Sequence, residues 1–274
     1  MTQSPADTLQ LPYGPGSISR HVLRRPEYML GGMSALLLQL ADPRVAAAVA
    51  DHSDFAHRIF DRLRSTMDVM VEIGVGEPED GRRALHEFRR SHRGVRGTTP
   101  DGSPYDARDP ELRLWVFATL IATAMSVEAR YADEFDEDDR RRYYMESLVM
   151  ASVLGVEEAP PDLNAFRSYM ATRLDSLQVT DQAREIARQV LSPHIGWIPG
   201  FVFAPLHVIA ADLLPRQIRI AYGLRLSTTQ RRWLRRIQAL SRATLPRIPE
   251  PIRTFPVLHP LHGLRDHLMV AAGR

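Results

Sequence analysis

The chain has 274 residues, of which 44% are hydrophobic and 25% charged, values typical of a folded globular protein. Its formal net charge is only +2, and all 35 basic residues are arginines because the sequence contains no lysine. It contains no cysteine either. These absences exclude disulfides, thiolate metal ligands and nucleophilic amines, so any redox or metal chemistry would have to be anchored by histidine.

The length allows one large or two small domains, and we expect one. Residues 1–18, rich in Pro, Gly and Ser, predict an irregular arm before a helical domain over residues 19–245. Residues 246–274 predict a Pro-rich extension packed on that domain. The polar start lacks the basic and apolar regions of a secretory signal, so we expect a cytoplasmic protein.

Apolar residues recur at helical spacing along the whole chain, and alternating runs of β-branched residues are scarce. This pattern predicts a single all-α domain. Asp42-Pro43 and Asp109-Pro110 each resemble an N-cap followed by proline at the first helical position. The expected helices cover residues 29–41, 43–52, 55–74, 77–92, 110–121, 139–154 and 180–190. One more helix is expected to begin at residue 163.

The expected helix over 55–74 has one mainly apolar face, on which Ile59, Leu63, Thr66, Met70 and Ile73 recur at steps of three and four. Arg62 and Thr66 lie one turn apart on an adjacent row. They can therefore converge on a single ligand. On spacing alone, an arginine packed over its own stem and an ordinary helical threonine explain the pair equally well.

His92 ends an arginine-rich helix and is followed by the helix-stopping Gly94 and Gly97. This position can present one imidazole rigidly to a cofactor, although a histidine near a helix C-terminus also compensates the helix dipole. His86 lies six residues earlier, about 600° around the helix, so the two do not share a face. No familiar zinc spacing is present.

From Pro215 onward, the sequence contains many arginines but only two acidic residues, Glu250 and Asp266. Such a basic surface can contact anionic lipid, so peripheral membrane contact stays open, or it can be a solvated helical face. No zinc-finger or aromatic RNA-binding signature accompanies the charge, so we expect no nucleic-acid partner.

Several segments, in this order along most of the chain, resemble the MpaB and rubber oxygenase (latex-clearing protein) family of haem proteins. No single segment is diagnostic, but their order is fairly specific. The segments are 35–43 (ALLLQLADP), 51–53 (DHS), 62–66 (RLRST), 92–97 (HRGVRG), 105–110 (YDARDP) with 115–116 (WV), and 213–215 (LLP).

The resemblance implies an all-α fold that holds haem b, with His92 as the iron ligand and with Arg62 and Thr66 lining the opposite side of the haem. It also implies an oxygenase that uses dioxygen on a hydrophobic substrate, such as an isoprenoid chain. A guanidinium can stabilise negative charge developing on oxygen, and a hydroxyl can donate a hydrogen bond to it. His52 would orient a haem propionate or a ligand, or serve only a structural role at a helix end.

The chain departs from the family pattern at two positions. Members usually carry histidine where this chain has Asp42, and some rubber oxygenases carry lysine where it has Ser65. Helix capping explains Asp42 and is worth about 1 kcal/mol, so we assign it no catalytic role. The absence of the lysine implies a different sixth iron ligand, and polyisoprene need not be the substrate.

Two further hypotheses remain. The first is a cofactor-free helical protein that binds lipid or a protein partner through its arginine-rich tail and the apolar segment 196–214. The second is a divergent haem protein that binds haem without turnover. Neither the substrate nor the oligomeric state can be read from the sequence.

Overall fold

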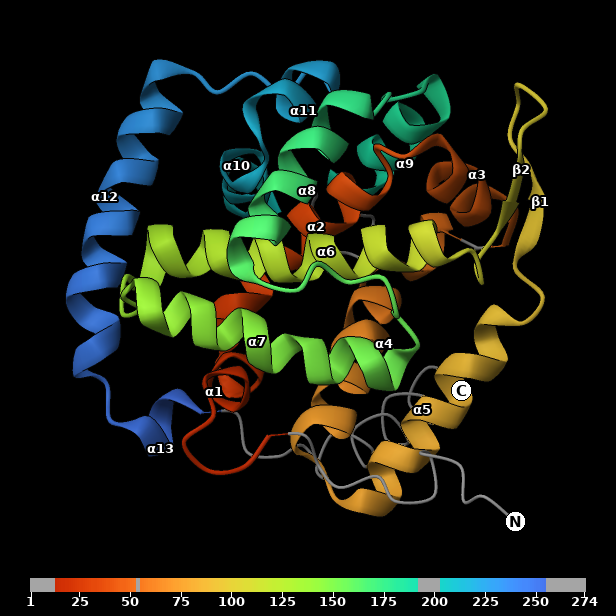
Figure 1. Cartoon of the computed structure of the whole chain (residues 1–274). Coiled ribbons are helices and arrows are strands. Elements are labelled where there is room, and N and C mark those ends of the chain that lie inside the picture. Colours follow the sequence, from red (N-terminus) through yellow and green to blue (C-terminus); the bar gives the residue numbers. More distant parts are fainter. Residues whose placement is uncertain (1–12, 53–54, 192–202, 255–274) are drawn as a thin grey trace, which may run out of the picture.

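The computed structural model describes residues 13–52, 55–191 and 203–254, with side chains for all of these except residues 55–64 and 251. These residues form an all-α fold with one small β-hairpin, as predicted (Figure 1). The elements, in chain order, are α1 (Ile18–Arg24), η2 (Pro26–Gly31), α2 (Gly32–Gln39), α3 (Pro43–His52), α4 (Phe55–Val75), α5 (Pro78–His92), β1 (Arg96–Thr98), β2 (Pro104–Asp106), α6 (Pro110–Val127), η3 (Glu128–Ala132), α7 (Glu137–Leu154), α8 (Leu163–Ser176), α9 (Asp181–Leu191), α10 (Ala204–Leu213), α11 (Arg216–Ala221), α12 (Thr228–Thr244), η5 (Leu245–Arg247) and α13 (Glu250–Arg253).

The centre of the fold is α6, which crosses the middle of the molecule in Figure 1 and packs against α2, η2, α7 and α10. Trp115, Ala118 and Val127 are completely buried, and buried residues occur on several sides of the helix. A helix that is apolar all round belongs in the core. Burial on several sides therefore makes α6 the element on which the others assemble.

Local capping signals begin the helices where the sequence predicts. The carboxylate of Asp42 accepts a hydrogen bond from the backbone N–H of Arg44, which satisfies a free donor at the start of α3. Asp109 caps α6 in the same way, and Asp162 caps α8. The hydroxyl of Thr180 accepts from the N–H of Ala183 at the start of α9.

The β-hairpin was not predicted. Strands β1 and β2 pair antiparallel, with Gly97 opposite Tyr105. A Cβ on Gly97 would lie 2.5 Å from the Tyr105 hydroxyl oxygen, so only glycine fits this close approach. Gly102 has φ +90° in the connecting turn. Gly97, which was expected to end a helix, therefore also shapes the β-hairpin. Strands of three residues are too short for an alternating pattern to reveal them.

The Pro-rich stretch expected to be extended from residue 246 is, in its described part, the 3₁₀ turn η5 followed by α13. The buried side chain of Arg253 anchors α13, because its guanidinium lies 2.5 Å from Glu27 Oε1 and 2.5 Å from Glu134 Oε1. Residues 255–274 lie outside the described part. The division of the chain at residues 18 and 245 stays a prediction.

Among the described residues, one helix, Pro110–Ala132, is long and apolar enough to cross a membrane, and 56% of it is buried inside the molecule. The segments Pro26–Gln39 and Pro43–His52 satisfy the same criteria only as a pair bent by 104°. The apolar segment 196–214 contains α10, and its residues 196–202 lie outside the described part.

Candidate functional site

The predicted site residues lie on a helical hairpin made by α4 and α5. The acidic residues Glu79 and Asp80 in the first turn of α5 are stabilised by the positive end of its helix dipole. In Figure 1 the two helices are close where this turn joins them and diverge toward the other end. The two helix backbones are therefore farther apart at the end that carries Arg62 and His92.

Arg62 and His92 lie at nearly the same height in this hairpin. Arg62 is 13 residues before the end of α4, and His92 is 14 residues after the start of α5. At a rise of about 1.5 Å per residue, both are about 20 Å from the turn. The backbone thus places the two positions at the same end of the helical hairpin, while the side chain of Arg62 lies outside the described part.

His92 continues the inner stripe of α5. This stripe contains Ala84, Leu85 and Phe88, of which the first two are buried and the third is half-buried. His92 follows Phe88 by one turn and is also half-buried, whereas His86 on another side of α5 is exposed. The imidazole therefore leaves the helix on the side that faces α4.

The hydrogen bonding of His92 selects one tautomer. Its Nδ1 lies 2.8 Å from the carbonyl oxygen of Phe88, an acceptor, so Nδ1 must carry the proton. The Ser91 hydroxyl lies 3.0 Å from the same nitrogen, and the Phe88 ring packs 4.4 Å from the imidazole, centroid to centroid. In this tautomer the lone pair is on Nε2, and a metal-binding histidine is held in the same way by a carbonyl on its other nitrogen.

Thr66 lies on the inner side of α4, in line with Met70 and Ile73 at steps of four and three. Ile73 is completely buried, and Met70 lines a small cavity of about 20 Å³ with Ile121 and Tyr143. Thr66 on the same face is exposed. The inner face of α4 is therefore buried at Ile73 and solvent-accessible at Thr66, two turns away.

His52, at the end of α3, is exposed and contacts the β-hairpin formed by β1 and β2. Its Nε2 lies 3.2 Å from the carbonyl oxygen of Arg96, and its ring meets Tyr105 edge-on at 6.2 Å. The carbonyl is an acceptor, so Nε2 donates. This bond attaches α3 to the strand that begins four residues after His92. A contact between His52 and a cofactor stays a prediction.

The neighbouring Asp51 was not singled out by sequence reasoning. It accepts a 2.5 Å hydrogen bond from the hydroxyl of Tyr105, whose ring is buried against Gly97. Burial, assisted by the Asp51 carboxylate, raises the pKa of Tyr105 to about 12, so the phenol stays protonated and keeps donating. Asp51 and His52 together fix the segment that leaves α5.

Asp42 has a larger structural role than capping. It is buried, and its carboxylate pairs with Arg44 at 3.0 Å and with Arg173 of α8. The Arg173 guanidinium carbon lies 5.4 Å from the centroid of the buried Trp115 ring, a cation–π contact. The carboxylate thus joins α3, α8 and α6, and all its near partners are structural.

Within the described part of the chain, no group of three or more His, Cys, Asp or Glu side chains could hold a bare metal ion. His92 is therefore a single-imidazole position. A haem needs only such a position, because the porphyrin itself supplies four of the iron ligands.

Comparison with known proteins identifies the family. Residues 20–243 match the model of the catalytic domain of the ER-bound oxygenase mpaB/B′ and rubber oxygenase. Uncharacterized proteins of Mycobacterium tuberculosis and Mycobacterium bovis are each 28% identical over 229 residues, which cover 80% of this chain and 90% of the relative. No solved structure matches significantly. The family match spans most of the chain, so the protein belongs to the mpaB and rubber oxygenase catalytic-domain family.

Proposed function

We propose that this protein is a haem-b-dependent oxygenase that uses dioxygen on a hydrophobic substrate, with His92 as the protein ligand of the iron. Family membership supports the class of reaction. The observation that carries the assignment of His92 is its Nδ1 contact with the Phe88 carbonyl, which leaves the lone pair on Nε2.

The residues present fit a haem in three respects. The imidazole is held in the ligating tautomer, it lies on the inner face of α5, and the opposing face of α4 is accessible at Thr66. When bound, haem b would supply an iron centre able to bind and activate dioxygen.

The chain's own groups would orient and stabilise the reactants. His92 would hold the cofactor through Nε2. The guanidinium of Arg62 would offset negative charge that develops on oxygen, and the Thr66 hydroxyl would donate a hydrogen bond from Oγ1. Groups fixed on helices perform this role without reorganisation during the reaction, which is why a helical hairpin suits it.

A hydrophobic substrate is consistent with the apolar surroundings of α4. Val69 and Met70, next to Thr66, pack against the core and present apolar side chains beside the proposed site. Apolar walls with a few polar groups are typical of sites for hydrophobic molecules. The hydrophobic class of the substrate and the cytoplasmic location stay predictions.

The experiment is an absorption spectrum of the purified full chain, with and without added haem. We expect a Soret band that is lost or shifted in His92→Ala and retained in His86→Ala, because His86 is exposed on another face of the same helix. Circular dichroism would show that both variants keep their helices. A folded wild-type protein that takes up no haem would contradict the proposal and favour a cofactor-free binding protein.

Turnover is tested separately by dioxygen uptake with polyisoprenoid or other alkene substrates. We expect uptake by the wild-type protein and a loss of about tenfold or more in Thr66→Val, which removes one hydrogen-bond donor from the site. A haem-loaded protein that consumes no dioxygen with any such substrate would support binding without turnover instead.

A further inference from the structure

The stretch from residue 213 to residue 249 contains nine arginines and no acidic residue. Its main element is α12, which forms one edge of the molecule in Figure 1. An uninterrupted run of one charge creates a strong local potential even though the whole protein is nearly neutral. The structure shows which of these charges are used internally.

One face of α12 holds the helix to the body. Leu234 is buried, Gln238 donates to Asp212 at 2.9 Å, and the Ser241 hydroxyl donates to the Tyr131 carbonyl at 2.6 Å. The Arg242 side chain donates hydrogen bonds to the carbonyl oxygens of Ala129 and Arg130. Its positive charge thus lies at the negative C-terminal end of the continuous helix formed by α6 and η3. These contacts fix the orientation of α12.

Exposed arginines lie on the opposite face, at Arg232 and Arg236, and beside the contacting face, at Arg231 and Arg235. Among the described residues, Arg242 is the one arginine of α12 that pairs with a carboxylate, Asp133 at 3.7 Å. Four others are exposed and pair with no described carboxylate: Arg231, Arg232, Arg235 and Arg236. Their charges are therefore free to meet an external anionic partner.

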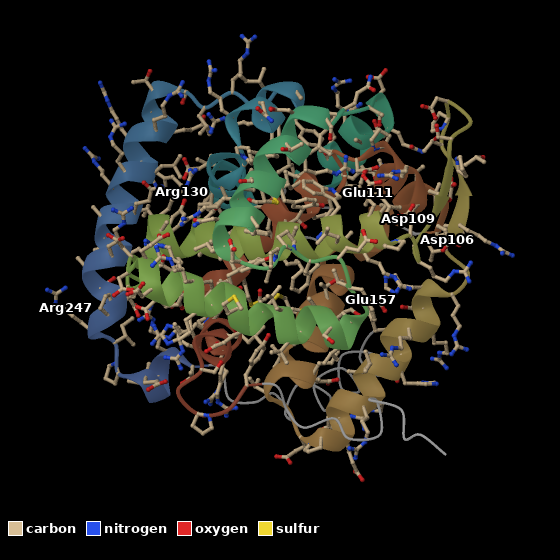
Figure 2. All side chains as sticks on the ribbon, viewed as in Figure 1. Asp106, Asp109, Glu111, Arg130, Glu157 and Arg247 are labelled. Carbon is tan, nitrogen blue, oxygen red and sulfur yellow. The ribbon has the colours of Figure 1, made fainter. Side chains whose placement is uncertain are left out.

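Aliphatic side chains extend the same edge. Leu240 follows Arg232 and Arg236 at steps of four and is 59% exposed, and Ile252 on α13 is 76% exposed. The neighbouring Arg253 is buried in its ion pairs with Glu27 and Glu134, so α13 is fixed in place with Ile252 pointing outward. Ile248, between them in sequence, is also exposed, and Figure 2 shows Arg247 projecting away from the body at the end of α12.

The combination of unpaired guanidinium groups with protruding aliphatic side chains points to one kind of partner. Anionic lipid headgroups attract the arginines, and the acyl boundary accepts Leu240, Ile248 and Ile252. Nucleic-acid surfaces usually add exposed aromatic rings for base stacking. The large exposed apolar residues in the described part are all aliphatic or Met, and the aromatic residue of α12, Trp233, is only partly exposed.

We propose that the edge formed by α12, η5 and α13 is a membrane-docking surface that binds anionic bilayers, with Arg232 and Arg236 supplying charge and Leu240 and Ile252 entering the lipid. The surface lies outside the proposed haem site and needs no cofactor. A protein that binds no haem but does bind vesicles would leave this proposal standing and contradict the haem proposal. A protein that binds haem but not vesicles would contradict only the docking surface.

The test is vesicle flotation of the full chain with phosphatidylcholine alone or mixed with phosphatidylglycerol. We expect binding to the anionic vesicles, weakened about 30-fold or more in Arg232→Glu/Arg236→Glu. Arg82→Glu/Arg90→Glu on the exposed side of α5 changes the net charge equally and is the matched control. Equal losses in both variants would show diffuse charge attraction and overturn the proposal.

The aliphatic contribution is tested by Leu240→Ser/Ile252→Ser at a salt concentration that screens surface charge. We expect at least tenfold weaker binding to anionic vesicles than for the wild type. Unchanged binding, or tighter binding of a single-stranded oligonucleotide than of vesicles, would contradict a bilayer as the partner.

Discussion

Helices α6 and α4 are both long, but their environments differ. Helix α6 is buried on several sides, and its polar Trp115 Nε1–H donates to the carbonyl oxygen of Gln39 at 3.3 Å. In helix α4, Ile73 is completely buried, whereas Thr66 on the same face is exposed to solvent. Helix α6 therefore holds the fold together, whereas α4 keeps an accessible segment, on which the proposed site lies.

The largest expected effect is on α6. Replacing Trp115 by alanine should lower the free energy of unfolding by about 3–5 kcal/mol, because a fully buried ring leaves a cavity and the Arg173 contact is lost. Urea denaturation followed by circular dichroism measures the loss. Trp115→Phe keeps most of the volume and should cost less; equal costs would show that packing at this site is unimportant.

The buried carboxylate beside α6 gives the next effect. Arg173→Met should destabilise by about 2–4 kcal/mol, because buried Asp42 then keeps Arg44 as its one charged partner among the described residues. As a control, Arg188→Met removes an exposed pair with Glu185 and should change stability by less than about 1 kcal/mol. Similar denaturation midpoints for the two variants would argue against a structural role for Asp42.

Helix α1, which packs on α4, provides a pH-dependent effect. Burial, with help from Arg25, lowers the pKa of His21 to about 4, whereas the unfolded chain has a value near 6.5. The unfolded state therefore binds more protons between these values, and stability should fall by up to about 3 kcal/mol as pH drops from 6.5 to 4. In His21→Phe, the free energy of unfolding should change less between pH 6.5 and 4. An unchanged pH dependence would show that other groups cause it.

The smallest stability effect is expected at Thr66. Thr66→Val should alter the free energy of unfolding by less than about 1 kcal/mol, since the residue is exposed and the two side chains have similar helix propensities. The same variant should lose dioxygen uptake. A large loss of stability with unchanged uptake would reverse the contrast between α4 and α6.

Local features of the fold were predictable from the sequence. The caps at Asp42, Asp109 and Asp162 depend only on backbone groups a few residues away, so the local sequence contains the whole interaction. The ion pair between Asp42 and Arg173 joins residues 131 positions apart, and that of Arg253 with Glu27 joins residues 226 apart. No local pattern encodes such pairs.

The candidate site was predictable only in part. Helical spacing placed Arg62 and Thr66 one turn apart, and its position at a helix end made His92 a candidate among the ten histidines. Only the family resemblance assigned it to a haem iron. The hydrogen bond from His92 to Phe88 could have been anticipated from their spacing of four. The contact of His52 with Arg96 depends on the unpredicted hairpin, so it could not.

Chemical rescue of a His92 variant tests whether this imidazole binds the haem iron. In His92→Gly reconstituted with haem, we expect the wild-type Soret position to be absent and to return when free imidazole is added, since the imidazole can occupy the vacated ligand position. His86→Gly should match the wild type without imidazole. A wild-type spectrum from His92→Gly in the absence of imidazole would contradict ligation by His92.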